Sequence, residues 1–244
     1  LHGVGASVVN ALSEWLEIEI YKDGDIYTQR FERGNIKTNL EIVGKTEKTG
    51  TLVRFKPDAE IFKETTEFDF EILKTRLREQ AFLNAGIHIQ ISDERDPDHI
   101  ICENFCYEGG ISSFVEYLNK KKAVELVHPD IIHFSTVADD DQATAEVAMQ
   151  YNDSYNELIL SFANNIHTTD GGTHEEGFKR SLTRVMNDYA RKYNLLKDSD
   201  KNLTGDDVRE GLTVVISIKV KDAQFEGQTK AKLGNTEISG LVSN

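Results

Sequence analysis

The spacing of apolar residues changes several times along the chain, and each spacing predicts one kind of element. Residues 67–84 (EFDFEILKTRLREQAFLN) repeat apolar positions every three or four residues, which predicts an amphipathic helix. Residues 175–193 predict a second, longer helix with the same spacing. Residues 16–31 (LEIEIYKDGDIYTQRF) alternate on both sides of Asp-Gly, which predicts a β-hairpin. The chain therefore combines amphipathic helices with strands.

Further elements follow from the same patterns. A helix is predicted near the start, with Val8, Leu12, Trp15 and Leu16 along one face. A short helix is predicted after Gly109 and Gly110. Residues 144–152 and 157–166 are expected to pair as a hairpin. Single strands are predicted at 39–50, 51–57, 87–95 and 213–220. Because helices and strands interleave without strict alternation, the predicted fold class is α+β in both halves.

Length and charge narrow the picture. A chain of 244 residues is long enough for one large domain or two smaller ones. Its formal net charge of −14 repels nucleic acid in bulk, so contact with DNA would need a local basic stripe. No apolar run reaches about 18 residues and no signal peptide is visible. A soluble, cytoplasmic protein is expected.

The first loop, HGVGAS at residues 2–7, combines two glycines with the start of a helix. Glycines let successive backbone N–H groups point the same way, and the helix adds its positive end, so an anion such as a triphosphate would be favoured. A tight turn is the alternative. The loop is neither a Walker loop nor a dinucleotide fingerprint, because both of those patterns are absent.

Three other segments carry candidate chemistry. The loop GQTKAKLGN at 227–235 places Gln228 and Lys230 between glycines, where a lysine can act as a mobile point charge toward a phosphate. Thr51 and Val53 share one face of a predicted strand, and a hydroxyl beside an apolar wall suits an adenine ring. The alternatives are a solvated basic turn for the loop and a simple β-forming role for the threonine.

The long helix carries the one basic stripe of this acidic chain. Arg180, Arg184 and Arg191 fall close to one face, with Lys192 nearby, and are weighed as a DNA contact. A solvated face paired with Glu175 and Glu176 is the alternative, and it is somewhat favoured.

Two cysteines are too few for a disulfide framework. Cys102 and Cys106 form H-x2-C-x3-C with His99, which offers only three ligands where a structural zinc site uses four. We therefore predict ordinary thiols and no metal site.

The order of these segments is more specific than any one of them. HGVGASVVNALS, KTGT followed by V-x-F, YEGGI, FANNI, GGTHEEGF, TGDDVREGL and QFEGQTKAKLG together resemble the ATPase subunit of bacterial type IIA topoisomerases over essentially the whole chain. The gyrase branch of that family is preferred, and the topoisomerase IV branch stays open.

The resemblance implies a fold and two domains. Residues 1–105 would be the C-terminal part of a GHKL ATP-binding α/β sandwich. Residues 106–244 would be a transducer domain with a fold like domain 2 of ribosomal protein S5. The catalytic glutamate, the magnesium-binding asparagine and the adenine-reading aspartate of the family would precede Leu1. The polypeptide alone is therefore expected neither to hydrolyse ATP nor to bind it tightly.

The resemblance also implies roles for individual residues. Leu1, His2, Gly3, Val4 and Gly5 would belong to the lid that wraps the phosphates of ATP. Thr51 and Val53 would lie beside adenine, while Gln228 and Lys230 would reach the γ-phosphate. Arg180 and Arg184 would face DNA. The implied cofactors are ATP and Mg²⁺. The implied partners are DNA, a second copy of the same protein and the DNA-cleaving A subunit.

Two other functions remain open at the level of sequence. One is a non-catalytic interaction module in which the glycine loops only make turns. The other is a different GHKL ATPase, such as a mismatch-repair protein or a chaperone, which would share the lid pattern without FEGQTK.

Overall fold

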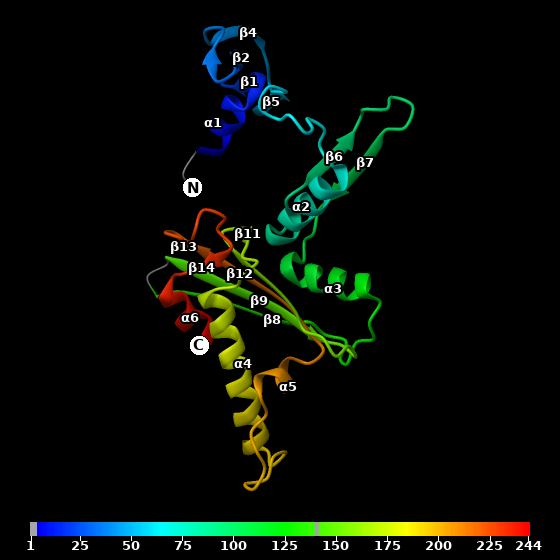
Figure 1. The fold of residues 1–244 in the computed structure, drawn as a ribbon, viewed down its shortest axis with the longest axis vertical. Helices are drawn as coiled ribbons and strands as arrows, with labels where there is room; N and C mark the ends of the chain where they lie inside the picture. The colour runs from blue at the N-terminus through cyan, green and yellow to red at the C-terminus, as the bar shows by residue number, and fades with distance from the viewer. Residues whose placement is uncertain (1–3, 140–141) are drawn as a thin grey trace. The chain divides into compact units, whose positions relative to one another are not determined.

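The computed structural model of the chain describes residues 4–139 and 142–244 (Figure 1). The chain divides into two compact units, Leu1–Asp69 and Phe70–Asn244, and each has a five-stranded sheet of its own. The domain boundary expected between residues 105 and 106 falls within the second unit and stays a prediction. Residues 94–100, in the polar stretch around Pro97, connect two paired strands.

The first unit is one helix followed by an antiparallel sheet. Strand β1 pairs with β2 and β5, and β2 also pairs with β3 and β4. Asp23 and Gly24 both have positive φ in the turn between β1 and β2, as a two-residue hairpin requires. The predicted Asp-Gly hairpin is therefore confirmed. The elements are α1 (Val4–Ala11), β1 (Ser13–Lys22), β2 (Asp25–Glu32), β3 (Asn35–Ile36), β4 (Glu41–Lys45) and β5 (Gly50–Pro57).

The helix predicted through Trp15 and Leu16 is wrong in its second half. Helix α1 ends at Ala11, where Ser13 Oγ donates to the carbonyl of Val9 at 2.6 Å. Strand β1 begins at Ser13, and every residue from Trp15 to Tyr21 lies opposite a residue of β5, with Leu16 opposite Phe55. Over one turn, the apolar positions at Trp15 and Leu16 fit the spacing of a helix and the alternation of a strand equally well, and the chain forms the strand.

The second unit is built on a mixed sheet of order β11-β10-β12-β9-β8. Strand β12 lies at its centre, and eight of its nine residues are buried, as its continuous apolar run predicts. The elements are α2 (Phe70–Leu83), β6 (Ile89–Asp93), β7 (Ile101–Phe105), α3 (Gly110–Lys122), β8 (Ile132–Val137), β9 (Ala143–Tyr151), β10 (Leu158–Ala163), β11 (Ile166–His167), α4 (Thr173–Lys192), α5 (Gly205–Arg209), β12 (Leu212–Val220), β13 (Phe225–Glu226), β14 (Lys232–Leu233) and α6 (Thr236–Ser243).

The hairpin predicted between residues 144–152 and 157–166 is wrong. Strand β12 lies between β9 and β10, pairing antiparallel with the first and parallel with the second. All three strands are rich in apolar residues, so the sequence pattern did not reveal that a strand from residues 212–220 inserts between two that are close in sequence.

Helices cover both faces of this sheet (Figure 1). On one face Phe82 of α2 and Phe114 of α3 stack at 4.6 Å between ring centroids and pack with Val215 of β12. On the other face Phe178 of α4 and Ile238 of α6 pack with Val214. Alternate residues of β12 thus serve two cores, which fixes the register of the sheet.

Helix α5 is stabilised by a capping box. Thr204 Oγ1 accepts from the N–H of Asp207, and the Asp207 carboxylate accepts from the N–H of Thr204. Replacing Thr204 with alanine is expected to lower the free energy of unfolding by about 1 kcal/mol, because an orphan N–H loses its acceptor. Urea unfolding measures this change. Thr236→Ala, at an exposed helical position without such a bond, is the control, and equal losses in both variants would contradict the assignment.

Within the described residues, no helix is long and apolar enough to cross a membrane.

Candidate functional site

The described residues begin with helix α1. Leu1, His2 and Gly3 lie outside the described residues, so their role in the lid stays a prediction. Val4 and Gly5 begin α1 and are exposed, and a Cβ at Gly5 would meet nothing within 4 Å. The first turn carries no acidic residue, and its N–H groups lack acceptors inside the helix, so the electrostatics of this helix end favour an anion.

Thr51 and Val53 lie on one face of β5, as predicted. They are opposite Ile20 and Ile18 of β1, and Val53 is 49% exposed. The other face of the same sheet is polar: Arg54 pairs with Glu19 at 2.9 Å. A hydroxyl therefore stands at the end of an exposed apolar surface that a flat ring can cover.

The predicted lysine lies in the tight turn between β13 and β14. Gly227 and Lys230 both have positive φ, and the N–H of Lys230 donates to the Gly227 carbonyl at 3.4 Å. Gln228 is exposed. The Lys230 ammonium lies 5.9 Å from the centroid of the Phe225 ring, and no described carboxylate forms an ion pair with it. Lys232, two residues on, is paired with Glu226 at 3.3 Å. The turn thus presents one positive charge that no described carboxylate pairs with.

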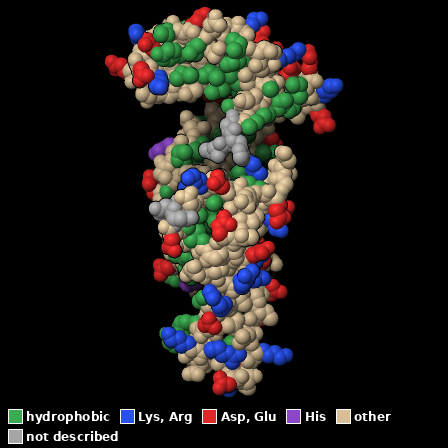
Figure 2. Space-filling model, turned by 90° about the vertical axis from the view of Figure 1, so that its left-hand side faces the viewer, with side chains coloured by type: hydrophobic (Ala, Val, Ile, Leu, Met, Phe, Trp, Pro, Cys, Tyr) green, Lys and Arg blue, Asp and Glu red, His purple; other side chains and the backbone are tan. Residues whose placement is uncertain are grey.

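The predicted basic stripe is only partly free. Arg191 is occupied by the loop after α4, where it donates to Asn202 Oδ1 and the Asp200 carbonyl. Arg180 and Arg184 are exposed and have no ion pair with a described carboxylate. They line a groove of about 660 Å³ between α4 and α5, together with Lys179 and Arg209. Figure 2 shows Lys and Arg side chains along the lower end of the view, where Figure 1 places α4.

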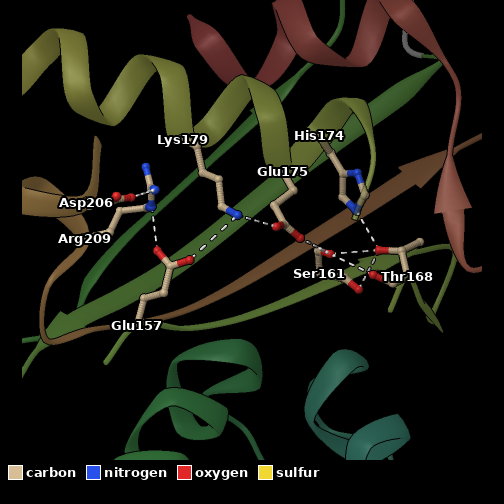
Figure 3. Close-up of polar contacts among 8 residues, drawn as sticks. All are labelled: Glu157, Ser161, Thr168, His174, Glu175, Lys179, Asp206 and Arg209. Atoms are coloured by element: carbon tan, nitrogen blue, oxygen red, sulfur yellow. Dashed lines mark hydrogen bonds and ion pairs between the residues drawn. The ribbon is translucent and has the colours of Figure 1, made fainter. Parts of the chain in front are cut away.

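Sequence reasoning missed a polar network beneath this groove (Figure 3). Glu157 Oε2 accepts from Arg209 Nε, and Lys179 Nζ lies 2.8 Å from Glu175 Oε1 and 3.9 Å from Glu157 Oε1. Glu175 Oε2 in turn accepts from Ser161 Oγ at 2.9 Å. The i, i+4 pair of Glu175 and Lys179 is visible in sequence, but Glu157 and Arg209 are brought to it only by the fold.

The inner end of the network is the fully buried His174. The Thr168 hydroxyl lies 2.8 Å from the Ser161 carbonyl oxygen and forms a hydrogen bond of 3.0 Å with His174 Nε2. The other ring nitrogen, Nδ1, is buried without a described partner. Desolvation lowers the pKa of His174 to about 4, with nearby Glu175 acting weakly in the opposite direction. His174 is neutral at physiological pH.

The cysteines are engaged separately. Cys106 Sγ lies 3.5 Å from His88 Nε2, and His99 Nδ1 lies 2.9 Å from Asp96 Oδ2. Cys102 Sγ accepts from Gln90. Across the described parts of the chain, no group of three His, Cys, Asp or Glu side chains is placed to hold a metal ion.

The candidate residues fall into two sets. Val4, Gly5, Thr51 and Val53 are in the first unit. In the second unit, the Lys230 turn and the start of α4 lie side by side, because the N–H of Asp170 donates to the Ala231 carbonyl at 2.9 Å.

Two solved structures resemble the chain over 99% of its length. One is the 43K ATPase domain of Thermus thermophilus gyrase B in complex with an aminocoumarin, with a TM-score of 0.84, 39% identity and 64% of that chain covered. The other is the topoisomerase IV ATP-binding domain of Francisella tularensis in complex with a small-molecule inhibitor, with a TM-score of 0.79, 32% identity and 64% covered. The fold is thus the mixed α/β fold of the GHKL ATPase domains, which confirms the predicted class.

The family model described as DNA gyrase B matches residues 110–244. The DNA gyrase B protein of Halalkalibacterium halodurans is 56% identical over all 244 residues, which are 37% of its own length. A DNA gyrase B protein of Bacillus mycoides is 56% identical, with 59% of its length covered. The chain belongs to the DNA gyrase B family, as its motifs predicted. It spans less than two thirds of the length of these relatives.

Proposed function

We propose that this chain is the segment of a type II DNA topoisomerase ATPase subunit that couples ATP to DNA strand passage and supercoiling. The observation that supports this most is the Lys230 turn, whose ammonium has no carboxylate partner among the described residues and whose backbone is tied to the start of α4. An uncompensated lysine on a tight turn suits a phosphate that is sometimes present and sometimes absent. Family membership favours this function over an interaction module or another GHKL ATPase.

The residues present fit a nucleotide. The first turn of α1 at Val4 and Gly5 suits phosphate oxygens, and the exposed face with Thr51 and Val53 suits adenine. We propose that these residues, with Leu1, His2 and Gly3, bind ATP, and that Gln228 and Lys230 contact its terminal phosphate. ATP would supply the γ-phosphate whose presence the lysine reports.

The described residues do not form a magnesium site, since no cluster of metal ligands occurs among them. We propose that Mg²⁺ is bound by residues outside this chain, together with the general base for hydrolysis. Candidate partners are DNA, the DNA-cleaving gyrase A protein or its topoisomerase IV counterpart, and a second copy of the protein.

The test is a chimera, in which this chain replaces the matching 244 residues of the Halalkalibacterium halodurans gyrase B protein. Mixed with that organism's gyrase A protein, the chimera is expected to supercoil relaxed plasmid only when ATP is present. The unmodified gyrase B protein is the control. A chimera that folds and binds nucleotide but never supercoils would contradict the proposed function.

Arg180 and Arg184 are proposed to contact DNA phosphates through the groove beside α4. Replacing both with glutamine in the chimera is expected to reduce the slope of log affinity against log salt by roughly 0.9 for each lost phosphate contact. Binding of a DNA duplex at several salt concentrations measures the slope. The control removes the same charge from α3, as Lys120→Gln with Lys121→Gln. Identical slopes in all three proteins would exclude the contact.

A further inference from the structure

The chain that follows Lys230 is bonded directly to the loop that begins α4. The N–H of Leu233 donates to the Gly171 carbonyl at 3.1 Å, and Gly172 forms a parallel bridge with Leu233. Directly after Lys230, the carbonyl of Ala231 accepts a hydrogen bond from the N–H of Asp170. Leu233 is fully buried in the core of the second unit. The base of the Lys230 turn therefore has little freedom relative to α4.

Glycine is what allows the two backbones to come this close. Gly172 has φ of 138°, and a Cβ there would lie 2.4 Å from the Leu233 carbonyl oxygen and 2.6 Å from its nitrogen. Neither atom belongs to a flexible side chain that could move aside. Any larger residue would push the strand and the loop apart.

A second close approach lies further along α4. Helix α6 follows β14 directly and packs against α4 at Gly177, where a Cβ would lie 2.7 Å from the Ser239 carbonyl oxygen. Hydrogen bonds flank this contact: Thr173 Oγ1 donates to the Asn235 carbonyl at 2.6 Å, and Arg184 Nη2 donates to the Ser243 carbonyl at 3.2 Å. The segment after Lys230 thus follows the same stretch of α4 that carries Arg180 and Arg184.

We propose that Gly172 and Gly177 are positioning residues that join the Lys230 turn, α6 and the first half of α4 into one rigid body. A displacement of the turn then carries Arg180 and Arg184 with it, because close-packed backbone contacts transmit movement instead of absorbing it. The joined body is a property of the second unit alone. Its use in coupling rests on the proposed function, through the roles of Lys230 and the arginines.

The structure offers a matched pair of glycines for the test. Gly177→Ala in α4 meets the backbone of Ser239, whereas Gly240→Ala in α6 meets nothing within 4 Å. Both changes place alanine inside a helix, so their effects on helix propensity are alike. Only the first presses α4 and α6 apart.

The first measurement is amide hydrogen exchange in the chimera. The amides of Asp170, Leu233 and residues 178–184 are expected to exchange through one shared opening of the structure. Their opening rates should agree within about threefold. Gly177→Ala should accelerate all of them by about tenfold, and Gly240→Ala should leave them unchanged. If Leu233 exchanged independently of α4 in Gly177→Ala, the rigid body would be disproved.

A milder variant guards against loss of folding. Thr173→Val removes the hydrogen bond to the Asn235 carbonyl while keeping the side-chain shape, and should accelerate exchange of the same amides by roughly threefold.

In the same proteins, the number of supercoils introduced per ATP hydrolysed is expected to fall severalfold in Gly177→Ala but not in Gly240→Ala. Joint exchange without a change in this ratio would keep the rigid body and reject its role in coupling. A chimera that never supercoils, by contrast, would reject the proposed function and leave the exchange result intact.

Discussion

Replacing Lys230 with alanine in the chimera is expected to reduce ATP-dependent supercoiling by about 5- to 150-fold, the range that allosteric couplings usually span. The ammonium of Lys230 has no described ion-pair partner, so its charge is available to a phosphate. Without this charge, the proposed other contacts would still hold the nucleotide. The second unit would no longer contact the terminal phosphate, so it would not respond to ATP hydrolysis. Nucleotide affinity is therefore expected to change little.

Lys232→Ala is the matched control, because it removes the same charge two residues away. Lys232 is already paired with Glu226 at 3.3 Å, so its loss should leave supercoiling near the level of the unsubstituted protein. Supercoiling assays and titration with a fluorescent ATP analogue separate the two effects. Unchanged supercoiling in Lys230→Ala, or a parallel loss of nucleotide binding, would contradict the role given to this lysine.

The second large effect is a loss of stability at acid pH caused by His174. Its folded pKa of about 4 lies below the ordinary value of 6.5, so the unfolded state takes up the proton first as pH falls. The stabilisation from a neutral His174 is thus complete above about pH 6.5 and is lost as pH falls toward 4. The loss is about 2 kcal/mol by pH 5 and about 3 kcal/mol by pH 4.

His174→Gln isolates this contribution from that of the carboxylates. An amide in place of the imidazole keeps a donor for Thr168 but does not titrate. When the pH falls from 7 to 4, the free energy of unfolding of the parent chain is expected to decrease by about 3 kcal/mol more than that of the variant. Urea unfolding at several pH values measures it, and NMR titration of the imidazole gives the pKa directly. A difference that stayed constant with pH, or a pKa near 6.5, would show that the ring is solvated.

Most elements were predictable because their patterns are local. The Asp-Gly turn, the α2 and α4 helices and the buried strand β12 each follow from residue spacing within a few turns of chain. Two predictions failed where a pattern was ambiguous or non-local. Trp15 and Leu16 satisfy helix and strand spacing alike, and the separation of β9 from β10 depends on a strand some fifty residues beyond β10.

The site divides in the same way. Lys230, Thr51 and the arginines of α4 are identifiable from sequence as candidates. The structure adds that Thr51 lies opposite Ile20 and that Lys230, Arg180 and Arg184 have no ion pair with a described carboxylate. The network from Arg209 through Glu157 to Glu175 could not be predicted, because its members come from three parts of the chain that the fold brings together. The two glycine contacts between α4 and the segment after Lys230 are equally non-local.

A structure of the chimera with an uncleavable ATP analogue bound tests the role of Lys230 most directly. We predict that Lys230 Nζ lies about 3 Å from an oxygen of the terminal phosphate, as a charge-assisted hydrogen bond requires. If the analogue were fully bound and the Gln228–Lys230 turn were too far away to contact its terminal phosphate, the proposed role of Lys230 would be wrong.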